Sequence, residues 1–303
     1  AISKNDGKKY KIINNSLLNA ASVPEAIIFK NKTLLYYVNG DFDQHSIFVS
    51  EVSKDGKSAS IIGPIKLNGE IIKDAVDPDL IITSEGKLRL FYYVGLFTKP
   101  VMGKKPNKIY SAVSEDGVNF RIEGPVVSLD GGTDPTVVQL TNGSLLLAIP
   151  QAEKLNIQFY NSVDGKVFSK ISSLKGGIPE LALNNEGNPE LLFQEAEGFV
   201  RYTSLNSGKS WEKTNKNVLA GYPIGAASPT VIRVTKKERK MFFFKIKDNC
   251  TTPPTAYLED KDALKKLAER SRGKPPLGDG VKPPARGNAT GKPPLGDGVK
   301  LRK

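Results

Sequence analysis

Acidic residues stand beside a proline at regular intervals along this chain, and carboxyl groups in such a set can carry proton-transfer chemistry. Five prolines each open an apolar run, and four of them have a carboxylate next to them. The candidates are Glu25, Asp77, Asp79, Asp134 and Glu180. Acid/base cleavage of a glycosidic bond needs one protonated and one ionised carboxyl group. If the fold gathers these residues, their mutual repulsion raises the pKa of at least one of them.

A structural role is the alternative for each of these acids taken alone. An Asp before Pro can cap the start of a strand, and an acid after Pro can accept a hydrogen bond from a neighbouring backbone. Gathering the whole set at one place would gain nothing structurally, because like charges repel. The set therefore favours chemistry over scaffolding.

The prolines belong to a repeated hairpin pattern. Each opens an apolar run, and a short polar turn and a second apolar run follow. The five copies begin at "VPEAIIF", "DPDLIIT", "DPTVVQL", "IPELALN" and "SPTVIRV", at Pro24, Pro78, Pro135, Pro179 and Pro229. Short apolar runs on either side of a polar turn are typical of a β-hairpin.

A second repeat lies further along each copy. "SEDGVNF" at 114–120 returns as "SVDGKVF" at 162–168, and more loosely as "SLNSGKSW" at 204–211 and "SKDGKSAS" at 53–60. We expect this turn to close a third strand onto a fourth. Its Ser and Asp accept backbone hydrogen bonds, its Gly takes a positive φ, and its aromatic ring packs between sheets. The turn is therefore predicted to be scaffolding.

Together the two repeats predict an all-β fold, a five-bladed β-propeller of four-stranded antiparallel blades. We expect "KKYKIINN" at 8–15 to close the ring on the last blade, where Ala256–Leu258 is a weak candidate for a fourth strand. The predicted domain limits are 1–250 for the propeller, 251–272 for a linker with a short helix, and 273–303 for a flexible Pro/Gly/Lys-rich tail. In such a meander the Pro-centred starts and the second loops share one face, and the repeated turns lie on the other.

The second loops add polar and aromatic side chains to the expected working face. Binding candidates there are Asp41, His45, Phe97, Gln194 and Glu195. Sugar sites commonly combine an aromatic face with hydrogen-bonding side chains of this kind. A single His and the short spacing of Asp41 and Asp43 do not specify a metal, so we expect neither metal nor cofactor.

Composition narrows the partners. Of the net charge of +12, residues 261–303 carry +8, so nucleic acid or another anionic surface is expected to meet only the tail. The single Cys250 allows no intrachain disulfide, and no apolar run is long enough for a membrane-spanning helix. The sequence opens at "AISKND" as a chain does after signal-peptide removal, and we expect a secreted or periplasmic monomer.

The "DP" blade starts, the count of five and the "S-x-D-G-x-x-F" turns resemble the five-bladed propeller glycoside hydrolases, the arabinanase, xylosidase and fructosidase group. The turns themselves resemble the Asp-box of sialidase-like propellers. The resemblance covers about residues 8–250. It implies a general base at the first blade, an Asp that tunes a pKa at the third and a general acid Glu at the fourth. Asp134 matches the third-blade position, Glu180 follows its Pro where the family's Glu precedes it, and Val23 stands in the place of the base.

The leading hypothesis is a glycoside hydrolase-like propeller that acts on a carbohydrate at the channel mouth. Glu180, flanked by Ile178 and Leu181, is the predicted acid, with Asp77 or Asp134 as base. Glu25 and Asp79 are expected to contact the substrate. Because Val23 replaces the expected first-blade acid, a noncatalytic propeller that binds a glycan or a protein is the alternative.

Overall fold

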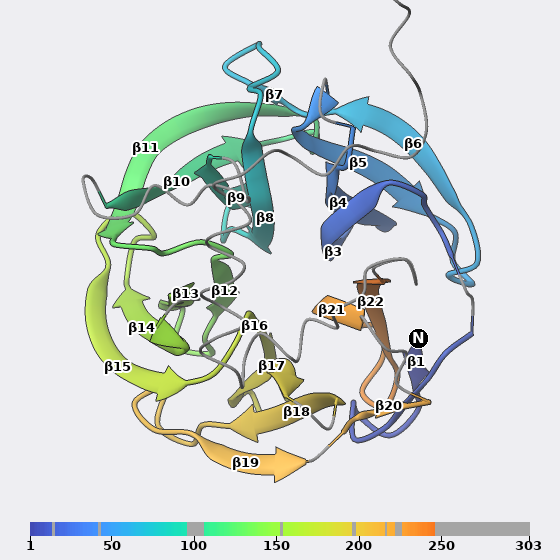
Figure 1. Ribbon diagram of the computed structural model, residues 1–303, viewed down its shortest axis with the longest axis vertical. Helices are drawn as coiled ribbons and strands as arrows, with labels where there is room; N and C mark the ends of the chain where they lie inside the picture. Colours follow the sequence, from blue (N-terminus) through green and yellow to red (C-terminus); the bar gives the residue numbers. More distant parts are fainter. Residues whose placement is uncertain are drawn as a thin grey trace, which may run out of the picture.

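Five mostly antiparallel sheets are arranged around a common axis in the computed structural model (Figure 1), and their inner strands line a central cavity, which we call the channel. The structure describes residues 1–13, 16–41, 44–95, 106–151, 154–195, 198–215, 217–221 and 226–245. The prediction of an all-β, five-bladed propeller is confirmed, and within these ranges there is no α-helix. Accordingly, no helix in the described ranges is a candidate to cross a membrane.

The first four blades each follow the chain outward from the channel, one strand after the next. Blade 1 consists of β3 (Ala21–Phe29), β4 (Lys32–Asn39), β5 (Ile47–Val52) and β6 (Ala59–Pro64). Blade 2 consists of β8 (Ala75–Ile82), β9 (Leu88–Val94), β10 (Asn107–Ser114) and β11 (Asn119–Leu129), with β7 (Lys66–Leu67) parallel to β11. Blade 3 consists of β12 (Thr136–Gln139), β13 (Leu145–Gln151), β14 (Asn156–Ser162) and β15 (Ser169–Lys175), and blade 4 of β16 (Pro179–Leu183), β17 (Pro189–Glu195), β18 (Gly198–Thr203) and β19 (Glu212–Asn215).

Blade 5 is assembled from both ends of the propeller. Its inner strands are β21 (Ala226–Arg233) and β22 (Arg239–Lys245), and β1 (Ile2–Ser3), β2 (Tyr10–Lys11) and β20 (Leu219–Ala220) complete the sheet. The N-terminal segment therefore closes the ring, as predicted, but the strand next to β22 is β1, which precedes the expected range 8–15. The weak strand candidate 256–258, the predicted helix and the tail lie outside the described residues.

Buried ion pairs hold this closure together. Asp6 Oδ1 accepts hydrogen bonds from Arg233 Nη1 at 2.6 Å and Arg239 Nε at 2.8 Å. Arg239 Nη1 lies 2.6 Å from Glu190 of blade 4, which also pairs with Arg201 at 3.1 Å. The N-terminal segment is thus tied to blades 4 and 5 by charges that compensate one another inside the protein.

The apolar core lies between the blades, because each sheet is covered on both faces by its neighbours. The second strands are therefore almost continuously buried, as in β13, where all seven residues are buried. The outermost strands such as β15 alternate between exposed and partly buried residues. This arrangement explains the uninterrupted apolar runs that follow each predicted turn.

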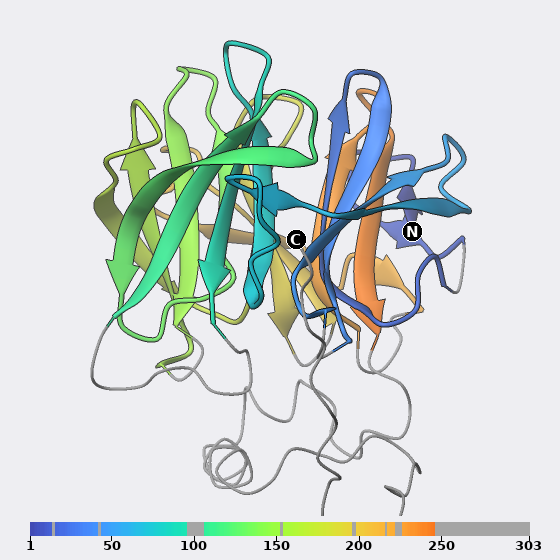
Figure 2. The same cartoon turned by 90° about the horizontal axis from the view of Figure 1, so that it is seen from above.

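The repeated turns at 53–60, 114–120, 162–168 and 204–211 are called the Ser-Asp turns below. They lie together with the first hairpin turns on one face, which we call the back face (Figure 2). Lys30, in the first turn of blade 1, bonds the carbonyl of Glu115 in the Ser-Asp turn of blade 2. The rings that end these turns pack against the preceding blade. Phe120 meets Tyr36 edge-to-face at 6.3 Å, Phe168 meets Phe91 at 5.9 Å, and Trp211 lies 4.9 Å from Phe159.

The inner strands are kinked where they enter the channel from the opposite, front face. The residue before the proline has a positive φ in four blades: Val23 at 45°, Asp77 at 54°, Asp134 at 44° and Ser228 at 44°. Register shifts accompany these entries in blades 1, 2 and 5. Such φ values are strained for non-glycine residues. Because Val23 and Ser228 share the strain, it belongs to the blade entry rather than to acid chemistry.

Candidate active site

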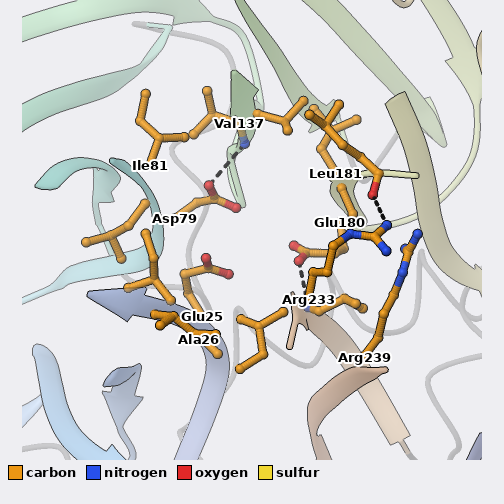
Figure 3. A pocket seen from close by; sticks show the side chains of 17 residues that line it. Glu25, Ala26, Asp79, Ile81, Val137, Glu180, Leu181, Arg233 and Arg239 are labelled. Atoms are coloured by element: carbon orange, nitrogen blue, oxygen red, sulfur yellow. Dashed lines mark hydrogen bonds between the residues drawn. The ribbon is translucent and has the colours of Figure 1, made fainter. Parts of the chain in front are cut away.

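Three carboxylates converge inside the channel, one residue after the proline in blades 1, 2 and 4. They are Glu25, Asp79 and Glu180, all buried, and their side chains point toward one another (Figure 3). Each offers an oxygen within 4.8 Å of the other two. This confirms that the Pro-centred repeats bring acids from separate blades together.

The residue after the proline also joins neighbouring blades by a repeated hydrogen bond. Its side-chain oxygen accepts a backbone N–H from the next blade at four of the five junctions. The four bonds are Val137 N to Asp79 Oδ1 at 3.1 Å, Leu181 N to Thr136 Oγ1 at 2.9 Å, Val231 N to Glu180 Oε1 at 2.9 Å, and Ala26 N to Thr230 Oγ1 at 3.2 Å. Glu25 accepts a bond from Thr230 Oγ1 at 2.7 Å. A carboxylate and a hydroxyl therefore perform the same structural task.

Burial raises the pKa of all three acids, and charge repulsion adds to it for Glu25 and Asp79. For Glu25, burial is the main cause, and the charges of Asp79 and Glu180 add to it. Burial also raises the pKa of Asp79 well above its usual value, with Glu180 contributing. The pKa of Glu180 rises to about 8 through burial, although hydrogen bonds from Val231, Thr230 and Thr136 oppose the shift. Burial therefore favours the protonated form of all three acids, and Glu180 holds its proton at neutral pH.

A second pair of acids lies one step nearer the front face, immediately before the prolines of blades 2 and 3. Asp77 Oδ2 accepts the backbone N–H of Asp134 at 3.1 Å. Asp134 Oδ2 accepts a hydrogen bond from Thr133 Oγ1 at 2.7 Å, and its buried Oδ1 has no hydrogen-bond partner among the described residues. One oxygen of this pair is thus uncommitted.

The environments of this pair separate the two pKa values. Burial, then the charge of Asp134, raises the pKa of Asp77 well above its usual value. Burial raises the pKa of Asp134 only to about 6, because the Thr133 hydrogen bond favours the ionised form. Near pH 7 Asp134 is therefore ionised while Glu180 holds its proton, and Asp134 is the better candidate for a base.

The converging acids line one part of a cavity of about 270 Å³ that follows the inner strands toward the back face. Its walls are aliphatic, with Ile81, Val137 and Leu181 among them, and Arg233 and Arg239 lie along its side (Figure 3). A low-polarity wall around carboxyl groups strengthens their electrostatic interactions. The same geometry could hold a cation. Two oxygens that each lie about 2.3–2.6 Å from one Ca²⁺ ion are at most about 5 Å apart. The three acids offer oxygens within 4.8 Å of one another, which meets this condition.

The predicted loop residues occupy different surroundings. Asp41 is exposed, and His45 Nδ1 lies 2.9 Å from Asp74 Oδ1 near the entry of blade 2. Gln194 is buried at the end of β17 with its Nε2 unpaired among the described residues. Glu195 accepts a bond from Tyr202 and pairs with Lys213 on the outer strands of blade 4. Phe97 and Asp43 lie outside the described residues, and all these binding roles stay predictions.

Sequence reasoning missed the hydroxyl groups of the site. Thr136 bridges the acids, since it bonds Glu180 at 3.4 Å and a hydrogen bond from it favours ionised Asp79. The Thr133 hydrogen bond opposes the rise that burial gives the pKa of Asp134, and burial followed by the charge of nearby Asp77 raises the pKa of Tyr93. Aligning the residue after each proline across all five blades would have placed Thr136 beside Thr230, but nothing in the pattern indicates Thr133 or Tyr93.

Solved structures with the same architecture are glycoside hydrolases. A family 117 glycoside hydrolase from the marine bacterium Zobellia galactanivorans is 14% identical, with a TM-score of 0.53 over 75% of this chain and 80% of that one. An α-L-arabinofuranosidase from Clostridium thermocellum is 14% identical, with a TM-score of 0.53 and coverage of 71% and 79%. The chain has the five-bladed propeller fold of these glycoside hydrolases.

A third neighbour is longer than this chain. The β-fructofuranosidase of Bombyx mori is 17% identical, with a TM-score of 0.52 over 72% of this chain and 53% of its own length. No family model and no curated protein sequence matches the chain. At these identities the likeness concerns the fold, and the chemistry has to be argued from the site.

Proposed function

We propose that the protein is a glycan-acting hydrolase that uses Asp134 as general base and Glu180 as general acid at the front end of the channel. The carrying observation is the split between their pKa values, about 6 for Asp134 and about 8 for Glu180. Between these values one group is ionised and the other protonated, which is the state that glycoside hydrolysis requires.

The threonines support a role for the acids beyond structure. Thr136 and Thr230 make the same inter-blade bond as Asp79 and Glu180. A hydroxyl in that place avoids the desolvation and the repulsion that a buried carboxyl brings. Carboxyl groups at Glu25, Asp79 and Glu180 are therefore not needed for joining the blades, and proton chemistry accounts for their presence.

In the proposed reaction Glu180 donates its proton to the glycosidic oxygen as the bond to the leaving group breaks. Asp134 accepts a proton from the attacking water. Asp77, whose raised pKa favours the protonated form, holds the backbone of Asp134 in place through the 3.1 Å hydrogen bond. Glu25 and Asp79 line the path of the substrate.

The substrate class is sought first among the sugars that the neighbours' names give: arabinofuranosides, β-1,3-galactosides and fructosides. The test combines a glycan-binding array with product analysis by mass spectrometry, and Asp134→Asn and Glu180→Gln are assayed on every positive glycan. Turnover in the wild type that both substitutions abolish supports the proposal. Turnover that neither substitution affects removes these two roles.

A noncatalytic glycan-binding propeller is the second candidate, and one specific observation favours it. Val23 stands at the first-blade entry, where the five-bladed hydrolases that the sequence resembles have their base. Val23 has the same positive φ as Asp77 and Asp134, so the entry geometry is kept while the carboxyl is absent. Glycans that bind on the array and are recovered intact from the wild-type protein would establish this candidate.

A further inference from the structure

The junction between blade 5 and blade 1 contains a second cavity, away from the acids. Its volume is about 810 Å³, which falls within the range of roughly 300–1,000 Å³ typical of small-molecule sites. We call it the junction slot. Its walls are Lys240–Lys245 of β22, residues 16–21, and Leu35 and Tyr37 of β4.

This junction has the weakest apolar packing of the five among the described residues. Its core consists of five buried residues, Ala26, Leu35, Val52, Ile232 and Phe242, with Leu17, Leu18 and Ala59 against them. The core between blades 1 and 2 has fourteen buried residues. Because protein interiors are normally close-packed, a thin core next to a large cavity marks a junction that the described residues do not fill.

The Ser-Asp turn of blade 1 lacks the aromatic ring that the other three turns contribute to their junctions. The Ser-Asp turns of blades 2, 3 and 4 each end in a ring that packs against the preceding blade, as Phe120, Phe168 and Trp211 do. The same position in the turn of blade 1 is Ala59, six residues after Ser53. Ala59 packs in the junction core, so the blade that should contribute a ring here contributes a methyl group.

The slot extends along β22. This strand lines it from Lys240 near the back face to Lys245 at the front, a distance of roughly 16 Å at about 3.3 Å per residue. Phe242 and Phe244 of this strand line the cavity together with Leu17 and Leu18. Such a shape fits an extended chain better than a compact ring system.

The back end of the slot carries a buried positive charge. Lys240 is only 6% exposed, and its Nζ donates a hydrogen bond to the carbonyl of Lys54. Among the described residues no carboxylate forms an ion pair with it, whereas Arg239 beside it pairs with both Asp6 and Glu190. A buried ammonium without a counter-charge is unfavourable, and an anion in the slot would compensate it.

We propose that the junction slot binds an anionic amphiphile, a linear hydrocarbon chain ending in a carboxylate, with the hydrocarbon between β4 and β22 and the carboxylate on Lys240. The apolar walls supply the hydrophobic contribution, and the ammonium fixes the orientation of the ligand. This site is independent of the channel acids and of the function proposed for them.

The test is calorimetric titration of the full chain with decanoate, with decanol as the uncharged match and decyltrimethylammonium as the cationic one. We expect decanoate to bind at one site and to raise the melting temperature. Lys240→Met is expected to weaken decanoate about tenfold or more and to leave decanol unchanged, because a hydrogen bond to a charged group is lost. Lys166→Met, on an exposed turn of blade 3, is the matched control and should bind like the wild type.

Ala59→Phe restores the ring that the other turns have, and we expect it to abolish binding of decanoate and decanol alike. If the phenylalanine side chain does not fit, Ala59→Leu introduces a smaller side chain, and we expect it to give an intermediate loss of binding. Circular dichroism confirms that each variant is folded. Absence of decanoate binding by the wild type, or binding that Lys240→Met and Ala59→Phe leave unchanged, would overturn the proposal.

Two other occupants give distinct results, and each also overturns the proposal. If residues after Lys245 fill the slot, the wild-type protein does not bind decanoate, and the double substitution Leu264→Ser and Leu267→Ser makes it bind. If a second copy covers it, the wild type is a dimer by sedimentation, and Ala59→Phe converts it to a monomer.

Discussion

Asp116 in a back-face turn and Asp134 in the channel are the same side chain in two opposite settings. Burial alone would raise the pKa of Asp116, but hydrogen bonds from Asn119, Val118 and Ser114 outweigh it and lower the pKa to about 2. Asp164, in the turn of blade 3, is lowered to about 2 by the N–H groups of Val167 and Lys166 and by Ser162. Asp134 has a single opposing bond and a pKa of about 6.

The difference shows how one repeat produces both scaffold and chemistry. At the turns the chain surrounds a carboxylate with N–H donors, which stabilise the charged form and fix the hairpin. At the channel the hydrogen-bond donors are few, the carboxyl groups are buried and other acids are near, so the neutral form is favoured. A residue whose charge is fully satisfied is suited to hold structure, and one whose charge is disfavoured is suited to exchange a proton.

The largest difference between substitutions in the channel and substitutions in the back-face turns is expected in catalytic turnover. Asp134→Asn and Glu180→Gln are each expected to lower turnover about 10²- to 10⁴-fold, because they remove the proton acceptor and the proton donor. Glu115→Gln, on an exposed back-face turn, is the matched control and should leave turnover unchanged. Initial rates on a glycan positive in the array measure this, and equal losses in all three variants would erase the distinction between the regions.

The pH dependence of stability should have opposite signs in the two regions. Folded Glu180 holds its proton to about pH 8, whereas the unfolded chain releases it near 4.5. The folded state therefore binds more protons between these values, and the free energy of unfolding falls as the pH rises through the window, by on the order of 5 kcal/mol. Urea unfolding at several pH values measures the slope. Glu180→Gln should flatten it, and a slope unchanged by the substitution contradicts the assigned pKa.

The glycine of the turn tests how tightly the scaffold region is built. Gly117 has a φ of 83°, and a Cβ there would lie 2.8 Å from Tyr36 Oη. Gly143, with a φ of 84°, has nothing within 4 Å of the same position. Gly143→Ala should cost about 1 kcal/mol from backbone strain, and Gly117→Ala about 1–3 kcal/mol more because side chains must shift. Equal losses in denaturant unfolding would mean that the turn does not depend on packing against blade 1.

The smallest expected effect is acid sensitivity of the turns. Because the folded pKa of Asp116 is below the 3.8 of the unfolded chain, its contribution is present above about pH 4 and is lost as the pH falls toward 2. Asp116→Asn should remove this loss and cost less than about 1 kcal/mol at neutral pH, since the group is largely exposed. Thermal melting between pH 2 and 5 measures it, with Asp55→Asn in the looser turn of blade 1 as a comparison.

The repeats made the fold predictable, and they also placed the acids. Five Pro-centred hairpins and four Ser-Asp turns were enough for the blade count, for the two faces and for the convergence of Glu25, Asp79 and Glu180. What they did not indicate was the strand order of blade 5, because β1 and β20 have two residues each and carry no periodic signal. The junction slot was not predicted either. Ala59 is unusual only when it is compared with the aromatic residues at the same position in the other Ser-Asp turns.

The pKa split was only partly predictable. A raised pKa for Glu180 followed from its apolar neighbours, and the structure agrees in direction. The choice between Asp77 and Asp134 as base was open, because it depends on which of the two receives the Thr133 hydroxyl. The contact between Thr133 and Asp134 joins two consecutive residues of a loop, and no sequence pattern indicates it.

The most direct test of the central claim, that the channel acids cleave a glycan, is product analysis of the wild-type protein in ¹⁸O-labelled water across pH 5 to 9. The account predicts one labelled oxygen per bond cleaved and a rate maximum between about pH 6 and 8, where Asp134 is ionised and Glu180 protonated. A glycan that binds and is recovered intact and unlabelled at every pH would contradict it.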